Sequence, residues 1–469
     1  MMRRTILVVA TVALTLLVAS GVALATAIGS AQAANKVVGP GESIQKAVNA
    51  AHPGATIVVK GVHREDVFIG KNGIKLRGDD AVIEAPPRAK ADSPCSKFLG
   101  APEAICVLGD FNPETGEVNK RVRDVSVSGF TFRGFKIAGK GDRCCAFVID
   151  VYAARNTTVE GNRLTGNVAG GIIAGEIINT TIAKNHVIGN PDTNAEGIVV
   201  TDNSRNTTVV ENDVRSIPEG LFAIEVAENH DTTVAENDLI GNGLGVDVGN
   251  STGTKILAND ITDSSVGMVS FESTNTKIVS NDISRSGDTG ITIFGPKRAN
   301  TDAKVVGNNI SGGAWGMYVA NTKGGFIAGN TIRDNCAGMF FEADGFEKGP
   351  VSGFEVKANT VEDNTRSCRA AKFDRNVSGI GIALLGARDI EVTGNHLSGN
   401  VPSGPTLISG GVVVSTDPYF GRTTKPMNNS VTGNHFDHNK PDIFWDKSGS
   451  GNSFVGNLCN KSVPSSLCK

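Results

Sequence analysis

The sequence predicts an all-β solenoid, a single parallel β-helix with three short strands in each coil. A unit made of an apolar pulse, an asparagine and a second apolar pulse recurs, as in "NTTVEGNRLTGN" (Asn156–Asn167) and "NTTIAKNHVIGN" (Asn179–Asn190). The pulses alternate apolar and polar residues and are rich in β-branched side chains, which is typical of strands. Glycine is abundant, at 57 residues, while aromatic residues make up 5%. This composition favours many tight turns around a narrow core.

The central asparagine of the unit sets the period of the coils. The shorter gaps are 22 to 23 residues and the longer ones 25 to 39, which indicates stacked coils with loop insertions. Neighbouring coils should lie about 4.8 Å apart. We expect each asparagine to turn the chain in a left-handed conformation and to hydrogen-bond to its counterpart in the next coil. The positions are Asn162, Asn185, Asn212, Asn237, Asn259, Asn281, Asn308, Asn330, Asn359, Asn395, Asn434 and Asn457.

The first 33 residues read as a secretory signal peptide. Arg3 and Arg4 precede an apolar run, and Ala31-Gln32-Ala33 fits a signal peptidase site. We expect cleavage after Ala33, export, and no membrane association of the mature chain. The alternative is an uncleaved anchor, because the run is long enough to span a bilayer. Residues 34–469 show no composition shift or linker, so we assign them to one β-helix domain.

Eight cysteines lie in the mature part, and their even number behind a signal peptide predicts disulfides. Adjacency suggests Cys459–Cys468 and Cys336–Cys368, whereas the connectivity of the other four stays open. No C-x-x-C pair indicates a thiolate metal site. The four with open connectivity are Cys95, Cys106, Cys144 and Cys145.

The charge is close to balanced, with 45 Lys+Arg against 48 Asp+Glu, and there is no long basic run. This argues against nucleic acid as the main partner.

The opening of the mature chain carries a family resemblance. The stretch "GPGESIQKAVNAAHPGATIVVKGVHREDVFIGKNGIKLRGDD" (Gly39–Asp80) resembles the start of right-handed parallel β-helix proteins of the pectin-lyase-like superfamily. The resemblance implies an N-terminal cap (about 39–60) with a short helix at Ser43–Ala50. Proteins of this fold include lyases, hydrolases, epimerases, esterases, binding proteins and accessory proteins of copper-enzyme maturation, so it implies the fold rather than one activity.

Several segments interrupt the repeat and are interpreted as insertions. The longest, about 86–121, is loop-like and contains two cysteines; shorter ones lie at 343–353, 364–377 and 399–409. Loops that leave one side of a solenoid often build its binding face.

Aligning the glycine-led strand of each coil gives the frame glycine, in, out, in, because neighbouring side chains alternate between faces. Met268, Met317 and Met339 then point inward, and we interpret them as a core stack rather than a copper site. The outward column is Ile173, Val199, Glu225, Asp247, Val269, Thr292, Tyr318 and Phe340.

Glu225 and Asp247 are adjacent acids in this column and form the candidate catalytic pair. Two carboxylates this close repel, so one pKa should rise, and such a pair can work as acid and base or hold Ca²⁺. Tyr318 and Phe340 offer a flat step for a sugar, with Glu342 near the same face. The alternative is an ordinary solvated face with two acids.

The histidines do not point to a site. His186, His396 and His435 each follow a ladder asparagine on another face, on coils that we expect to be too far apart to meet. The segment "HFDH" (His435–His438) is a weak metal candidate.

We therefore predict a secreted, monomeric β-helix protein that binds or cleaves a polysaccharide or cell-envelope glycan along its outer face. As an enzyme it would be a polysaccharide lyase or glycoside hydrolase, and Ca²⁺ is the candidate cofactor. The alternative is a non-catalytic envelope scaffold or accessory protein, similar to the copper-maturation accessory proteins of this fold.

Overall fold

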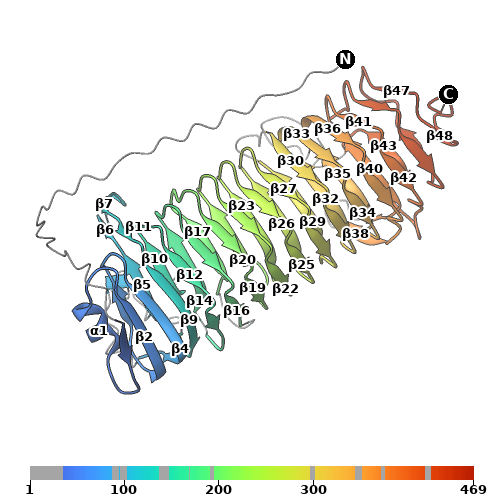
Figure 1. The fold of residues 1–469 in the computed structure, drawn as a ribbon. Helices are drawn as coiled ribbons and strands as arrows, with labels where there is room; N and C mark the ends of the chain where they lie inside the picture. The colour runs from blue at the N-terminus through green and yellow to red at the C-terminus, as the bar shows by residue number, and fades with distance from the viewer. Residues whose placement is uncertain are drawn as a thin grey trace, which may run out of the picture.

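The chain folds as a single parallel β-helix, which confirms the predicted fold class (Figure 1). The computed structural model describes residues 35–86, 94–95, 103–112, 114–136, 147–167, 169–190, 195–295, 302–343, 351–370, 375–417 and 424–468. The expected signal peptide, Cys144 and Cys145 lie outside these residues. Among the described residues, no helix is both long and apolar enough to cross a membrane.

One face of the solenoid is a fifteen-stranded parallel sheet to which each coil adds one strand. Its strands in order are β3 (Val67–Ile69), β5 (Ile105–Leu108), β10 (Phe147–Tyr152), β14 (Gly170–Gly175), β17 (Ile198–Thr201), β20 (Phe222–Ala227), β23 (Leu244–Gly249), β26 (Val266–Phe271), β29 (Thr289–Phe294), β32 (Trp315–Ala320), β35 (Ala337–Glu342), β40 (Ile380–Leu385), β43 (Gly410–Ser415), β46 (Ile443–Trp445) and β48 (Ser462–Val463).

The other two strand stacks join into a twenty-seven-stranded sheet, because the long strands β4 and β9 continue round the corner between them. The first stack contains β1 (Lys36–Val38), β2 (Thr56–His63), β4 (Lys75–Glu84), β9 (Ser126–Arg133), β12 (Thr158–Glu160), β15 (Thr181–Ala183), β18 (Thr208–Val210), β21 (Thr233–Ala235), β24 (Lys255–Leu257), β27 (Lys277–Val279), β30 (Ala303–Val306), β33 (Lys323–Ala328), β36 (Ser352–Lys357), β41 (Glu391–Thr393), β44 (Ser430–Thr432) and β47 (Ser453–Val455). The second contains β13 (Arg163–Leu164), β16 (His186–Ile188), β19 (Asp213–Arg215), β22 (Asp238–Ile240), β25 (Asp260–Thr262), β28 (Asp282–Ser284), β31 (Asn309–Ser311), β34 (Thr331–Arg333), β37 (Thr360–Glu362), β42 (His396–Ser398) and β45 (His435–Asp437).

The remaining elements are short. Helix α1 (Ile44–Ala50) lies at the N-terminal end of the solenoid, and its N-cap Ser43 accepts a hydrogen bond from the Lys46 amide at 3.2 Å. Three two-stranded pairs lie outside the main sheets: β6 (Asp110–Phe111) with β7 (Val118–Lys120), β8 (Val122–Arg123) with β11 (Ala154–Arg155), and β38 (Cys368–Ala370) with β39 (Arg375–Val377).

The segment predicted as one insertion, 86–121, is not loop throughout. Strand β5 lies within it and pairs in parallel with both β3 and β10. Its sequence, "ICVL", is apolar without alternation because three of its four residues are buried. The period-2 signal that identified the other strands is therefore missing there.

The core is one apolar stack that runs the length of the solenoid. Inward Val, Ile, Leu and Met side chains from all three strand stacks fill it, and most of them have no exposed surface. Met268, Met317 and Met339 are fully buried there, and the register stacks Met317 on Met339.

The asparagine ladder forms as predicted. The side-chain amide of Asn237 donates to the Val209 carbonyl at 3.0 Å and to the Asn259 side-chain oxygen at 2.9 Å. Its own oxygen accepts from the backbone and side-chain amides of Asn212 at 2.9 and 3.0 Å. Asn237 is 1% exposed, so water cannot reach the backbone groups that the turn leaves unpaired. The asparagine side chains provide their hydrogen-bond partners instead.

The predicted left-handed conformation is misplaced by one residue. The positive φ falls on the residue before the ladder asparagine, for example φ 54° at Lys184, 54° at Glu236 and 52° at Ala258. The first Asn of the "NTT" segments is also left-handed, with φ 51° at Asn156 and 52° at Asn179. The buried ladder asparagines are needed for their amide groups, whereas these five left-handed positions are exposed.

Sequence analysis missed a second asparagine ladder one turn later. Asn335 donates to Asn364 at 2.9 Å, Asn364 to Asn400 at 3.0 Å and Asn400 to Asn439 at 2.8 Å. In earlier coils the same turn position alternates between asparagine, as at Asn167 and Asn242, and other types such as Ile217 and Ser264, so the spacing is less regular.

Three disulfides close in the described residues. Cys336–Cys368 and Cys459–Cys468 are the pairs that adjacency suggested, and Cys95–Cys106 resolves one of the open connectivities.

Replacing Asn237 by Leu tests the ladder. The change leaves the Asn212 amides, the Val209 carbonyl and the Asn259 side chain short of partners, at about 1–3 kcal/mol for a buried unpaired group. We expect a clear drop in melting temperature. Asn179→Gly is the matched control, because Gly accepts the left-handed conformation and water can replace the exposed bonds of Asn179 to Asn156 and Asn206. Equal melting of Asn237→Leu and wild type would contradict the ladder.

Candidate functional site

Glu225 and Asp247 face the same side of the fifteen-stranded sheet. Strand β20 pairs with β23 so that Glu225 lies directly opposite Asp247, and the flanking partners in the column are Val199 and Val269. The odd–even alternation along both strands buries Ile224, Val226, Val246 and Val248 and leaves the two acids half-buried on the outer face.

Burial raises the pKa of both carboxyl groups, and repulsion by neighbouring acids adds to the shift of Glu225. Burial, followed by the charges of Glu196 and Asp247, raises the pKa of Glu225 to about 7. Burial alone raises the pKa of Asp247 to about 7, and it also raises the pKa of Glu196. Within the described part of the chain, no cationic group lowers the pKa of Glu225 or of Asp247. Both carboxyl groups therefore take up or release a proton near neutral pH rather than near pH 4.

The face around this pair is acidic. Asp202, whose pKa is raised by burial and by the nearby Glu228 and Glu176, lies further toward the N-terminus. Arg121 reaches this region but pairs with Glu176 at 2.9 Å. The residues assigned to the fifteen strands of this sheet include no Lys, Arg or His. An anionic ligand would therefore meet no compensating charge from these strands.

The predicted sugar platform is only partly available. Phe340 is 1% exposed and packs on Trp315, with ring centroids 4.7 Å apart. Glu342 has no exposed surface, and its carboxylate accepts a hydrogen bond from the Tyr318 hydroxyl at 2.7 Å. The expectation that Phe340 and Glu342 offer surface to a sugar is therefore wrong. Tyr318 is half-buried and still borders the face.

Two insertions cover this part of the sheet, which the sequence pattern could not indicate. Val377 and Ile408 pack with Phe340, Ala383 and Val413 in a second apolar cluster outside the solenoid core. The outward column is thus half-buried from Glu225 to Tyr318, and we call these five positions the open window. Val199, 4% exposed, bounds it on one side and Phe340 on the other.

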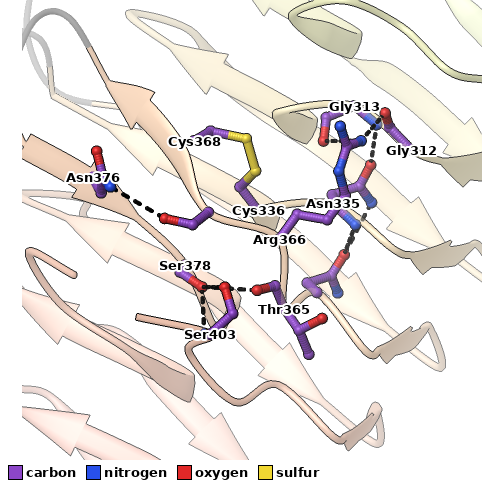
Figure 2. Close-up of a disulfide and its surroundings, with 12 residues drawn as sticks. Gly312, Gly313, Asn335, Cys336, Thr365, Arg366, Cys368, Asn376, Ser378 and Ser403 are labelled. Atoms are coloured by element: carbon purple, nitrogen blue, oxygen red, sulfur yellow. Dashed lines mark hydrogen bonds between the residues drawn. A yellow bond between two sulfur atoms is a disulfide. The ribbon is translucent and has the colours of Figure 1, made fainter. Parts of the chain in front are cut away.

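Figure 2 shows how the covering segment is held. The Cys336–Cys368 disulfide links the insertion 364–377 to the start of β35. The Arg366 guanidinium of the same insertion donates hydrogen bonds to the carbonyls of Gly312 and Gly313. The Ser378 hydroxyl donates to the Thr365 carbonyl at 2.9 Å and accepts from the Ser403 amide at 3.0 Å, which joins the two insertions. They form a fixed wall at one end of the open window.

A pair of aromatic rings beside the open window was missed by sequence analysis. Phe271 and Phe294 end strands β26 and β29, are half-buried, and have ring centroids 6.0 Å apart. Phe271 pairs with Gly249, which lies two residues beyond Asp247 on the same face. A Cβ at Gly249 would lie 3.8 Å from the Asp247 Oδ2, so glycine leaves room there. Comparing "VSF" with "TIF" in successive coils would have revealed these rings.

The histidines lie on the twenty-seven-stranded sheet. His396 and His435 stack with ring centroids 4.9 Å apart, so the expectation that they cannot meet is wrong. The long gap between them contains insertions rather than extra coils, since β42 pairs directly with β45. His438 pairs with Asp437 at 2.7 Å and His186 with Asp213 at 2.7 Å.

The stacked coils and the three strand stacks define a parallel β-helix whose outer face has one acidic open window. The chain belongs to the right-handed β-helix family: the family model described as "Right handed beta helix region" matches residues 196–347, 244–420 and 298–463. The comparison with copper-maturation accessory proteins stays a prediction.

Solved structures with the same fold align over much of the chain. DFA-IIIase from Arthrobacter chlorophenolicus A6 in complex with GF2 aligns at 14% identity and a TM-score of 0.45, over 66% of this chain and 83% of that one. The Dettilon tailspike protein aligns at 15% identity and 0.42, over 90% and 66%. Bacteriophage CBA120 tailspike protein 3 aligns at 10% identity and 0.46, over 90% and 56%. No curated protein sequence matches the chain significantly.

The raised pKa values predict how stability depends on pH. The unfolded chain releases the Glu225 and Asp247 protons near pH 4, whereas the folded chain holds them until about pH 7. Their contribution is therefore complete at low pH and is lost as pH rises from about 4 to about 7. Glu225→Gln and Asp247→Asn should match wild type in melting temperature at pH 4 and exceed it at pH 8. A constant offset across this range would contradict the shifts.

Proposed function

We propose that the chain is an exported enzyme that hydrolyses a polysaccharide in the open window, with Glu225 and Asp247 as its acid–base pair. The observation that supports this most directly is the in-register pairing of these two acids. They are half-buried and face no cation from their own sheet, and the pKa of each is about 7. Perturbed carboxyl groups on a concave or bounded face mark functional sites more often than ordinary surface acids do.

The two acids have different surroundings, and this assigns their roles. Glu225 is repelled by both Glu196 and Asp247, so neighbouring charges as well as burial favour its protonated form, and we assign it as the donor to the glycosidic oxygen. The pKa of Asp247 is raised by burial alone, so Asp247 would be the ionised partner. Neighbouring strands lie about 4.8 Å apart, closer to the roughly 5–5.5 Å carboxyl separation of retaining glycosidases than to the wider separation of inverting ones.

Hydrolysis fits the face better than elimination. A lyase removes a proton next to a uronate carboxylate and must neutralise the negative charge that develops, with a cation or strong donors. The strands of this sheet provide no Lys, Arg or His. A polyuronate would instead meet Glu225, Asp247 and Glu196, whose charges would repel it. This argument favours the hydrolase over the lyase.

The surroundings of the pair suit a chain-like sugar ligand. Phe271 and Phe294 form an apolar shelf against which a sugar ring could pack, and the wall beyond Tyr318 limits how far the ligand extends. Export agrees with the three disulfides, because such bonds persist in oxidising compartments. The partner in this proposal is therefore an extracellular or envelope glycan.

Single substitutions at the pair test the catalytic assignment. The purified chain is first screened against neutral, amino-sugar and uronate polysaccharides for new reducing ends and for unsaturated ends. Glu225→Gln and Asp247→Asn should each lower turnover about 10²–10⁴-fold without lowering the melting temperature at pH 7. Asp260→Asn is the matched control, because Asp260 is an exposed acid on β25 of the other sheet. Wild-type turnover in both site variants would refute the assignment, as would the absence of any hydrolysed polysaccharide.

The aromatic shelf gives a separate test of binding. Phe271→Ala should raise KM roughly 5–10-fold with a smaller change in kcat, since packing of aromatic rings contributes about 0.5–1.5 kcal/mol beyond area burial. The matched control is Phe326→Ala, which removes a half-buried phenyl ring from the twenty-seven-stranded sheet. An equal effect of both substitutions on KM would show that the shelf does not contact the glycan.

A further inference from the structure

A second group of reactive side chains lies near the N-terminal end of the fifteen-stranded sheet. Cys106 belongs to β5, where the register places it between Phe68 of β3 and Asp150 of β10. Cys95 forms a disulfide with it. Glu103 precedes the same strand by two residues. All four polar or sulfur-containing residues are buried, with exposed fractions of 2% for Cys95, 0% for Glu103, 1% for Cys106 and 7% for Asp150.

The buried carboxyl group of Glu103 lacks the hydrogen bonds that a folded protein normally gives such a group. Among the described residues, neither oxygen of its carboxyl group has a hydrogen-bond partner, although both oxygens are buried. A buried polar group without a partner costs free energy, and it occurs rarely in folded proteins. A carboxyl oxygen of Glu103 and the two sulfur atoms all lie within 4.8 Å of one another, the one such group of potential ligands found among the described residues.

These three donors are the type and number that a thiophilic divalent ion requires. Zn²⁺ binds thiolates at about 2.3 Å and carboxylates at about 2.0–2.2 Å, in tetrahedral sites. Two thiolates on one such ion lie about 3.8 Å apart, given that bond length and the tetrahedral angle. The Cα atoms of Cys95 and Cys106 are 5.9 Å apart, so side-chain rotation can open the sulfurs to this distance. Asp150, the register partner of Cys106 on β10, does not belong to this group of three, so a fourth ligand would be water.

We propose that Cys95, Glu103 and Cys106 form a redox-controlled site for a thiophilic divalent cation such as Zn²⁺. A dithiol reductant gives two electrons and two protons to the disulfide, whose S–S bond breaks to leave two thiols, while the reductant becomes a disulfide. The cation then displaces the two thiol protons and the proton of the buried Glu103 carboxyl group, and it binds two thiolates and the Glu103 carboxylate. In the oxidised chain the sulfurs are bonded to each other and no longer offer thiolates, so the site is closed. This proposal is independent of the acid pair and of polysaccharide cleavage.

Metal titration of the full chain in both redox states tests the site. The chain is reduced with a phosphine, which leaves no competing thiol, and titrated with Co²⁺ as a spectroscopic probe and with Zn²⁺ in competition. We expect the reduced chain to bind one ion at this site with a thiolate-to-cobalt charge-transfer band, and Zn²⁺ to raise its melting temperature. The oxidised chain should show neither effect. Identical titrations of the two redox states would overturn the proposal.

Variants assign the ligands. Cys95→Ser and Cys106→Ser should each remove the charge-transfer band, and Glu103→Gln should weaken Zn²⁺ binding at least tenfold. Glu103→Gln keeps the disulfide, so it remains informative if the cysteine variants fail to fold. The double variant Cys336→Ser/Cys368→Ser is the matched control, and it should bind like wild type. Retention of the band in Cys95→Ser or Cys106→Ser would show that other thiols bind the metal. Wild-type affinity in Glu103→Gln would show that this carboxylate is not a ligand, and either result would overturn the proposal.

Discussion

The register between successive coils is the constraint on which the rest of this structure depends. Every coil pairs with the next in parallel, so a given position in one coil lies beside the same position in its neighbours. Backbone hydrogen bonds fix this register along the strands, and the buried amide ladders fix it at the turns, as at Asn237 and Asn259. Loss of one side-chain amide removes hydrogen bonds to the preceding coil and to the following coil at once. Asparagine therefore recurs at this position in successive coils.

The same register places like charges side by side, and the degree of burial decides how their protons are held. On the twenty-seven-stranded sheet, Asp213, Asp238 and Asp260 stack in one column as closely as the acids of the other face. There the carboxylates are more exposed, and Arg215 pairs with both Asp213 and Asp238. Glu225 and Asp247 have no such partner and are more deeply buried, so their protons are held to about pH 7. An identical spacing thus gives a solvated charge ladder on one face and a pair of acids with raised pKa values on the other.

Sequence periodicity predicted the parts of the structure that repeat, and failed where the repeat is interrupted. It indicated the coil length, the three strand stacks, the inward methionines and the outward pairing of Glu225 with Asp247. It did not reveal that Phe340 is covered, because a covering insertion leaves the local alternation of its strand unchanged. It also separated His396 from His435, because a gap of 39 residues looks like additional coils when it contains loops. The strand β5 was missed because both of its faces are buried.

The insertions therefore decide which part of a uniform face is available for function. The strands themselves change little from coil to coil, since any larger change would break the register with both neighbours. Loops can vary without this cost, and here they cover the sheet beyond Tyr318 through contacts such as Ser378 with Ser403. The open window remains where no described insertion packs on the column, and the two acids lie at its N-terminal end. A ligand that runs along the coils would meet Glu225 and Asp247 first, then Val269 and Thr292, before the wall stops it. Position along the solenoid, rather than any local motif, distinguishes this acid pair from the other acids of the chain.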